Sequence, residues 1–341
     1  MSDQIPPSQS INKPKRFGKR LTHGLFLLVV IVALSYEAMA IDSSNHKPAS
    51  SGQTTSSSSI STSKSSTTPQ VNTATKSTAV NNIFVIVMEN QPLSNILGSS
   101  SAPYINSLIS SSALATNYSD VAHPSLPNYI ALTSGSTDGI TTDCNPPGAG
   151  CVVSVSNIAD EIEASGRTWK NYAESMPSAC YKYNYGSLFA TKHVPFLYYS
   201  DIYNNSTRCA SHIVPFSELS SDLNSVSTTP NFAFITPNLC DDMHSCPITS
   251  GDSWLSTNVP MILKSPAFSS QKSLLAITWD EGYSSDNIIA TIFAGSAAKS
   301  GYRSNVAYSH YSLLHTIENL WNLKPLTAND QNATLMSDML K

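Results

Sequence analysis

Residues 82 to 90 read Asn-Ile-Phe-Val-Ile-Val-Met-Glu-Asn, an apolar run that ends in two polar residues. Its apolar part, Ile83 to Met88, is continuous, which is typical of a strand buried on both faces of a sheet. Similar apolar runs recur at residues 232–236, 274–278 and 288–293. The sequence therefore predicts several buried strands that run largely parallel to one another.

Helical patterns separate these runs. They cover residues 104–112, 128–134, 157–165, 255–265 and 312–323. Buried strands that alternate with amphipathic helices are characteristic of an α/β fold. We therefore expect a three-layer α/β sandwich in which helices cover a largely parallel central sheet.

The first 40 of the 341 residues have the features of an export signal. A basic stretch precedes an apolar run at residues 25–34, and the small residues Ala38 and Ala40 follow it. This order matches a secretory signal peptide. Since the apolar run is shorter than the roughly 20 residues that span a bilayer comfortably, a cleaved signal and an N-terminal membrane tether through residues 25–40 both stay open. Either one predicts an exported protein, extracellular or at the outer face of the cell membrane.

Just over half of residues 41–80 are serine or threonine, and the segment has no apolar periodicity. Such a composition cannot bury a core, so this segment is predicted to be a disordered linker. The apolar run at 83–88 follows directly. We therefore expect the catalytic domain to occupy residues 81–341.

All six cysteines lie beyond the linker. An even number of cysteines in an exported protein indicates disulfides. A thiolate metal site is disfavoured because the sequence has no CxxC pair. Closeness along the chain favours the pairs Cys144–Cys151, Cys180–Cys209 and Cys240–Cys246.

The charge of the chain argues against nucleic acid as a partner. The whole chain has a formal net charge of −4, but several basic residues crowd the N-terminus. From residue 81 onward, 11 Lys and Arg face 20 Asp and Glu. Proteins that bind the phosphate backbone usually present a basic face instead.

Carboxylates follow two of the predicted strands. Glu89 and Asn90 come after the first strand, and Asp280 and Glu281 come after the run at 274–278. Ligands of open α/β sheets bind beyond the carboxyl ends of the strands. Carboxylates that converge there repel one another unless a cation neutralises them. We therefore predict one divalent metal ion, with Mg²⁺, Mn²⁺, Ca²⁺, Zn²⁺ and Fe²⁺ as candidates; the alternative for each pair alone is a solvated turn.

The segment His123-Pro-Ser-Leu-Pro-Asn-Tyr129 has the pattern of a loop that enters a helix, with Pro127 at an early helical position. Ser125 can be interpreted as an N-cap. It can also be interpreted as a nucleophile, because free helix amides attract phosphate and a nearby cation activates the hydroxyl. In the second interpretation Asn128 donates an N–H to a phosphate oxygen.

Two histidines follow or open predicted elements. His244 lies in the loop after the strand at 232–236, and His310 opens the last helix. At such positions an imidazole can bind phosphate, protonate a leaving alkoxide or coordinate a metal. His193, His212 and His315 are expected to be capping or core residues.

Together these motifs resemble the phosphoesterase family of acid phosphatases and phospholipase C type enzymes, a branch of the alkaline phosphatase-like superfamily. The resemblance covers about residues 83–323. It rests on five motifs in order: Met88-Glu89-Asn90, His123-Pro-Ser-x-Pro-Asn-Tyr129, Thr236-Pro-Asn238 with Asp242-x-His244, Asp280-Glu281-Gly282 and His310-Tyr-Ser312.

The resemblance implies a site around a serine that is phosphorylated during turnover, which maps to Ser125. It implies His244 and His310 as further catalytic residues. His123, Asn128 and Asp242 are the implied substrate-binding residues. The implied metal ligands are Glu89, Asn90, Ser125, Asp280 and Glu281.

The nucleophile loop also looks like that of nucleotide pyrophosphatase/phosphodiesterases, which bind two zinc ions. This chain departs from their pattern, because Asn238 stands where they have a metal-binding Asp and Glu281 replaces a His. We therefore expect a single metal ion.

The function predicted is hydrolysis of phosphate monoesters, with a phosphorylated small molecule or a phospholipid as substrate. A phospholipase C type phosphodiesterase is the first alternative, and residues 141–230 form the insert expected to decide between them. A stalked, non-catalytic surface-binding protein is the second alternative. The oligomeric state is not predicted.

Overall fold

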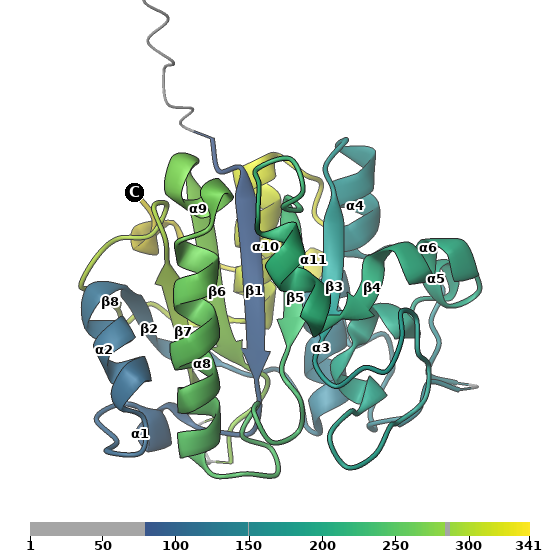
Figure 1. Cartoon of the computed structure of the whole chain (residues 1–341), viewed down its shortest axis with the longest axis horizontal. Coiled ribbons are helices and arrows are strands. Elements are labelled where there is room, and N and C mark those ends of the chain that lie inside the picture. Colours follow the sequence, from purple (N-terminus) through teal and green to yellow (C-terminus); the bar gives the residue numbers. More distant parts are fainter. Residues whose placement is uncertain (1–78, 149, 284–286) are drawn as a thin grey trace, which may run out of the picture. The chain divides into compact units, whose positions relative to one another are not determined.

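The computed structural model describes residues 79–148, 150–283 and 287–341 (Figure 1). The predictions for residues 1–40, and nearly all of the predicted linker, lie outside these ranges. Within them, no helix has the length and apolar character needed to cross a membrane.

The described residues form one nine-stranded sheet with the order β4-β3-β5-β1-β6-β7-β2-β8, and β9 also pairs with β2. Strand β1 runs parallel to β5 and β6, whereas β7 runs antiparallel to β6 and β2. The largely parallel sheet and all four predicted strands are confirmed. The strands are β1 (Asn82–Met88), β2 (Ala113–Ser119), β3 (Trp169–Ala173), β4 (Ile213–Pro215), β5 (Phe232–Thr236), β6 (Ser273–Trp279), β7 (Ile288–Ala294), β8 (Tyr302–Ser304) and β9 (Tyr308–Ser309).

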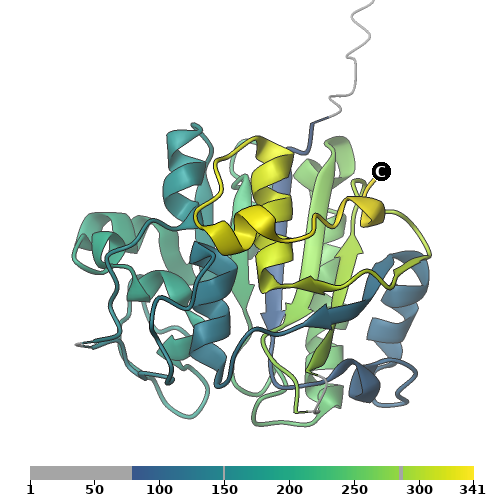
Figure 2. The same ribbon diagram turned by 180° about the vertical axis from the view of Figure 1, so that it is seen from behind.

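Helices cover both faces of this sheet, as predicted for a three-layer sandwich. Figure 1 shows α8 and α9 in front of the strands, and Figure 2 shows α3 and α10 on the opposite face. The α-helices are α1 (Leu93–Ile96), α2 (Pro103–Ser111), α3 (Ser125–Ser134), α4 (Ile158–Ala164), α5 (Ser200–Tyr203), α6 (Ser206–His212), α7 (Leu219–Asp222), α8 (Ile248–Leu263), α9 (Pro266–Ser270), α10 (His310–Trp321) and α11 (Ala328–Asn332). Short 3₁₀ helices are η1 (Thr191–His193), η2 (Pro195–Tyr198), η3 (Phe216–Glu218) and η4 (Ser337–Met339).

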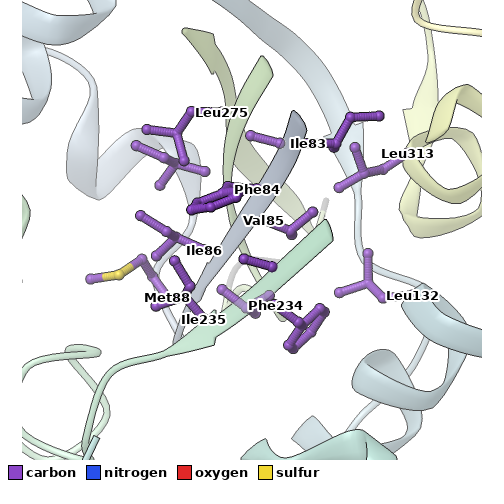
Figure 3. Close-up of a cluster of buried hydrophobic side chains, with 14 of the residues drawn as sticks. Ile83, Phe84, Val85, Ile86, Met88, Leu132, Phe234, Ile235, Leu275 and Leu313 are labelled. Atoms are coloured by element: carbon purple, nitrogen blue, oxygen red, sulfur yellow. The ribbon is translucent and has the colours of Figure 1, made fainter. Parts of the chain in front are cut away.

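Strand β1 lies in the centre of the core because every one of its side chains is buried. Successive side chains of a strand point to opposite faces. Val85 points toward Leu132 of α3 and Leu313 of α10 (Figure 3). Phe84 packs on the other face against Phe268 of α9, with ring centroids 5.0 Å apart. Burial on both faces explains the unbroken apolar run.

The C-terminus of α3 is fixed by a distant part of the chain. The helix ends at Gly135, whose φ of +76° favours glycine. A Cβ there would lie 2.4 Å from Asp330 Oδ1. The Thr327 hydroxyl donates to the Gly135 carbonyl at 2.8 Å. The segment before α11 therefore holds α3, whose other end carries Ser125.

The insert at 141–230 contains β3 and β4, which the sequence did not predict and which extend the sheet on one side. Two disulfides, Cys144–Cys151 and Cys180–Cys209, lie within it. The third, Cys240–Cys246, closes the loop after β5. All three predicted pairings are confirmed.

Candidate active site

The predicted site residues lie where the parallel strands β1, β5 and β6 end. Backbone hydrogen bonds continue the ladders past the strands. The Glu89 N–H donates to the Asp242 carbonyl at 2.8 Å. The Asp280 N–H donates to the Met88 carbonyl at 2.9 Å. The three loops are thereby held side by side at the carboxyl edge of the sheet.

Ser125 is the first residue of α3, and its residue surface is only 1% exposed. Its hydroxyl donates to Glu89 Oε2 at 3.1 Å. Lys192 Nζ lies 3.5 Å from the same hydroxyl oxygen. The hydroxyl therefore lies between a carboxylate from β1 and an ammonium group from the insert.

Glu89 forms the centre of the site and is fully buried. Its Oε2 accepts a hydrogen bond from Asn90 Nδ2 at 2.7 Å, and the Asn90 backbone N–H donates to Asp280 Oδ1 at 2.9 Å. Burial, together with the charges of Asp280 and Asp242, raises the pKa of Glu89 well above its usual value. The structure thus brings together Glu89, Asn90, Ser125 and Asp280 of the predicted metal set.

His193 joins this group, which differs from the expected structural role. Its Nε2 lies 3.0 Å from Glu89 Oε1, and its Nδ1 lies 3.2 Å from Asp242 Oδ2. Ligand atoms of these three residues all lie within 4.8 Å of one another, a separation that allows them to hold one metal ion. Asp242, predicted to contact substrate, therefore lies among the candidate metal ligands instead.

Tyr129 of α3 contacts both Glu89 and His193. Its hydroxyl donates to Glu89 Oε1 at 2.6 Å. Its ring stacks on the His193 imidazole, with centroids 5.3 Å apart and planes within 10°. One residue of α3 thereby orients two candidate metal ligands.

The donor atoms of the site fit a cation. Nine buried side-chain atoms of the described residues have no hydrogen-bond partner, and three of them belong to this site: Asp280 Oδ2, Asp242 Oδ2 and His193 Nε2. Burial raises the pKa of Asp242 and of Asp280 to about 7. Unpartnered polar atoms and crowded carboxylates are costly without a counter-charge. Carboxylate oxygens with one imidazole suit a divalent metal ion.

Glu281, also predicted as a metal ligand, contacts His123 instead. Its Oε2 lies 2.5 Å from His123 Nδ1. His123 Nε2 lies 3.3 Å from Asn287 Oδ1 and 3.8 Å from Asp120 Oδ2. Burial acts to lower the pKa of His123, but Glu281, Asn287 and Asp120 outweigh it and raise the pKa. The imidazole is half exposed and tends to carry a proton.

Lys192 has two further partners. Its Nζ donates to Asp143 Oδ2 at 2.9 Å and lies 3.4 Å from His244 Nε2. Burial acts to lower the pKa of Lys192, but Glu89 and Asp143 outweigh it and raise the pKa. Burial and the charges of Lys192 and His193 lower the pKa of His244. Lys192 is therefore a fixed positive charge, whereas His244 tends to be neutral.

His310 is placed differently from the expectation. It is fully buried, its Nε2 donates to the Asp280 carbonyl at 2.6 Å, and its Nδ1 lies 3.1 Å from the Tyr118 hydroxyl. Burial lowers the pKa of His310 to about 4. Both ring nitrogens are thus engaged, and the residue supports the Asp280 loop rather than reaching a substrate.

Asn128 likewise serves the loop before Ser125. Its Oδ1 accepts the N–H groups of Val121 and Ala122, each at 3.0 Å. Its Nδ2 donates to the Ala122 carbonyl at 2.7 Å. The side chain is fully buried and holds the loop instead of facing a phosphate.

His212 and His315 have the structural contacts expected of them. His212 stacks on Trp169, and its Nδ1 lies 2.8 Å from the Trp169 carbonyl. His315 Nδ1 lies 2.8 Å from the Ala333 carbonyl. Neither contact involves a residue of the candidate site.

Known proteins resemble this chain over most of its length. The Phosphoesterase family model matches residues 35–324. Phosphatidylinositol-3-phosphatase of Mycobacterium tuberculosis is 33% identical over 80% of this chain and 87% of its own. Acid phosphatase of Aspergillus fumigatus is 30% identical over 76% of this chain. The chain spans 58% of that fungal protein.

Solved structures agree on the fold. A protein of the alkaline phosphatase superfamily from Vibrio parahaemolyticus has a TM-score of 0.52 and 12% identity, and the match covers 75% of this chain and 71% of the other. Murine ectonucleotide pyrophosphatase/phosphodiesterase 5 also has a TM-score of 0.52, with 11% identity over 76% of this chain and 100% of the other. The alkaline phosphatase-like fold is therefore confirmed. On the family match and the relatives together, the chain belongs to the phosphoesterase family and is a hydrolase that acts on phosphoric ester bonds.

Proposed function

We propose that this protein is an exported, metal-dependent phosphomonoesterase that forms a phosphoserine intermediate at Ser125. The observation that carries the proposal is the position of the Ser125 hydroxyl at the start of α3, 3.1 Å from Glu89 Oε2 and 3.5 Å from Lys192 Nζ. A nucleophile at a helix N-terminus meets the free N–H groups that attract a phosphoryl group.

The proposed metal ligands are Glu89, Asp242 and His193. Asn90 lies beside them, because its side chain donates to Glu89 and its backbone N–H donates to Asp280. A bound divalent cation would lower the pKa of the serine hydroxyl and offset negative charge.

Ser125 Oγ attacks phosphorus in line with the leaving oxygen while its proton passes to Glu89 Oε2, and the phosphorus–oxygen bond to the leaving group breaks. Glu89 orients the attacking oxygen, because the hydroxyl already donates to its Oε2. Lys192 Nζ and the first amides of α3 stabilise the charge on the equatorial oxygens.

We infer that His123 protonates the leaving oxygen. The 2.5 Å contact with Glu281 orients the imidazole, and the raised pKa of His123 favours the protonated form that can donate to the leaving oxygen. His244 is less suited to this step because its pKa is lowered. In the second half-reaction, neutral His123 takes a proton from the water that hydrolyses the phosphoserine, and Glu89 returns the proton to the departing Ser125 Oγ.

Export is supported by the three disulfides, which persist in oxidising compartments. The predicted signal or tether at residues 1–40 agrees with this inference. The relatives that are named acid phosphatases and phosphatidylinositol-3-phosphatase all act, by name, on monoesters, which supports monoester over diester hydrolysis. The substrate is therefore a phosphorylated small molecule or a phosphorylated lipid headgroup.

The test compares hydrolysis of para-nitrophenyl phosphate and para-nitrophenyl phosphorylcholine by the purified protein, with and without EDTA. We expect monoester hydrolysis that EDTA abolishes and that Ser125→Ala loses by at least about 10³-fold. Preference for the choline ester would favour the phospholipase C alternative. Full activity of Ser125→Ala would remove the proposed nucleophile.

A further inference from the structure

Asp143 lies between two groups that the proposed function assigns to phosphate. Its Oδ1 accepts the backbone N–H of Leu126 at 3.2 Å. Its Oδ2 accepts a hydrogen bond from Lys192 Nζ at 2.9 Å. One carboxylate thus bridges an amide of α3 and the ammonium group beside the nucleophile.

These two donors are the ones a phosphoryl group would use. Leu126 directly follows Ser125, so its N–H belongs to the first turn of α3, where the amides have no partner within the helix. Lys192 Nζ is 3.5 Å from the Ser125 hydroxyl oxygen. Two carboxylate oxygens with a shared negative charge imitate two oxygens of a phosphate group.

We propose that Asp143 is an internal competitor of phosphate. Between turnovers its carboxylate orients Lys192 and covers the Leu126 amide, and an arriving phosphoryl group displaces it. The inference rests on the proposed function, because it takes Ser125 as the nucleophile and Lys192 as a phosphate-binding group. Asp143 is a positioning residue, and its effect is to weaken the binding of the product, inorganic phosphate.

The exposure of Asp143 allows this exchange. Its side chain is 32% exposed, whereas those of Glu89 and Asp242 are 0% and 1% exposed. When it is displaced, the Asp143 carboxylate can therefore rotate outward into the solvent, where an unpaired charge costs little free energy. The neighbouring Cys144–Cys151 disulfide tethers the backbone of this loop, so a side-chain rotation is enough.

The experiment measures inhibition by inorganic phosphate, with para-nitrophenyl phosphate as substrate, for wild type and Asp143→Asn. Asparagine keeps the shape of the side chain but removes its charge. We expect phosphate to inhibit Asp143→Asn about tenfold more strongly, and KM to fall, because a charge-assisted competitor has been removed. The matched control is Asp201→Asn, which removes the same charge from a partly exposed ion pair with Arg208 and should leave phosphate inhibition unchanged.

A second variant and a salt control test the proposal further. Asp143→Glu keeps the charge but cannot hold both contacts at the same distances, so phosphate should again inhibit more strongly; this variant decides the matter if Asp143→Asn does not fold. Repeating the assay at about 1 M salt, where exposed charges act over only roughly 3 Å, should leave the effect in place. A gain that disappears in salt, or unchanged phosphate inhibition in both variants, would overturn the proposal. Wild-type turnover with an inactive Ser125→Ala would still uphold the proposed function.

Discussion

The Ser125 hydroxyl donates a hydrogen bond to Glu89 Oε2 at 3.1 Å, although 36 positions separate the two residues. This contact joins the start of α3 to the end of β1. Glu89 also lies 3.0 Å from His193 through its other oxygen. The proposed nucleophile and the proposed metal ligands are therefore linked through one buried carboxylate.

Lys192 is expected to stabilise charge in the transition state. Replacing it by methionine keeps much of the side-chain volume but removes the ammonium group, so kcat/KM should fall about 10²- to 10³-fold. Lys192→Arg keeps the charge and should lose less. Steady-state kinetics with para-nitrophenyl phosphate provide the measurement. A methionine variant as active as wild type would mean that phosphate does not use this group.

His123 should matter most for poor leaving groups. His123→Gln cannot donate a proton as imidazolium does, so hydrolysis of an alkyl phosphate should fall about 10²- to 10⁴-fold. Para-nitrophenyl phosphate should be affected much less, because nitrophenolate leaves without protonation. Comparison of kcat for the two esters gives the test. Equal losses of kcat on the two esters would mean that another group is the general acid. His244→Gln is the matched control variant.

The loss of stability on metal removal should depend on pH. In the metal-free protein the pKa values of Asp242 and Asp280 are about 7, against an ordinary value of 3.8, so the folded state binds more protons than the unfolded state between these values. The unfolding free energy of the EDTA-treated protein should therefore fall as pH rises through this window. Metal binding requires deprotonated carboxylates, so it strengthens with pH.

The Tm difference between metal-loaded and EDTA-treated protein should accordingly widen between about pH 5 and about pH 7.5. Differential scanning calorimetry over this range gives the measurement. The His212→Gln variant, altered outside the site, should show the same widening. A difference independent of pH would contradict the proposed carboxylate ligands.

Glu318 should give the unfolding free energy a second pH dependence, one that does not involve the metal. This residue of α10 is 1% exposed. Burial, with the nearby Asp330, raises its pKa from 4.5 to about 9. The folded protein keeps this proton while the unfolded chain loses it, so stability falls as pH rises between these values. The slope is at most about 1.4 kcal/mol per pH unit, and smaller where solvent screens the group.

Glu318→Gln removes this proton and should flatten the decline of the unfolding free energy with pH. Urea unfolding of the metal-loaded protein at several pH values provides the comparison. Glu163→Gln replaces a more exposed glutamate and should leave the slope as it is in wild type. Parallel slopes for Glu318→Gln and wild type would show that Glu318 is ionised in the folded protein.

Much of the fold could be predicted because its central strands are buried on both faces. Strand β1 and strand β6 read as unbroken apolar runs for that reason. Strand β2 was missed, since its sequence Ala-Leu-Ala-Thr-Asn-Tyr-Ser is only partly buried and mixes apolar with polar residues. Strand β4 has three residues, too few for any periodic signal.

The site could be predicted where residues directly follow such strands, and at Ser125, where a loop enters a helix. Glu89 and Asp280 gave a signal because carboxylates come straight after apolar runs. Lys192 and His193 lie in η1, a single short turn within the insert, and the fold alone brings them to Glu89. Asp143 gave no signal, because its role depends on Lys192. The roles of His310 and Asn128 depend on which backbone groups face them, which spacing does not encode.

A phosphoserine formed at Ser125 during turnover determines the stereochemistry at phosphorus. The measurement is phosphoryl transfer from an isotopically chiral phosphate monoester to an alcohol acceptor, with the configuration of the product determined by NMR. Two successive in-line displacements, first by Ser125 and then by the acceptor, predict overall retention. Inversion would mean that the acceptor attacks phosphorus directly, and it would contradict the phosphoserine intermediate.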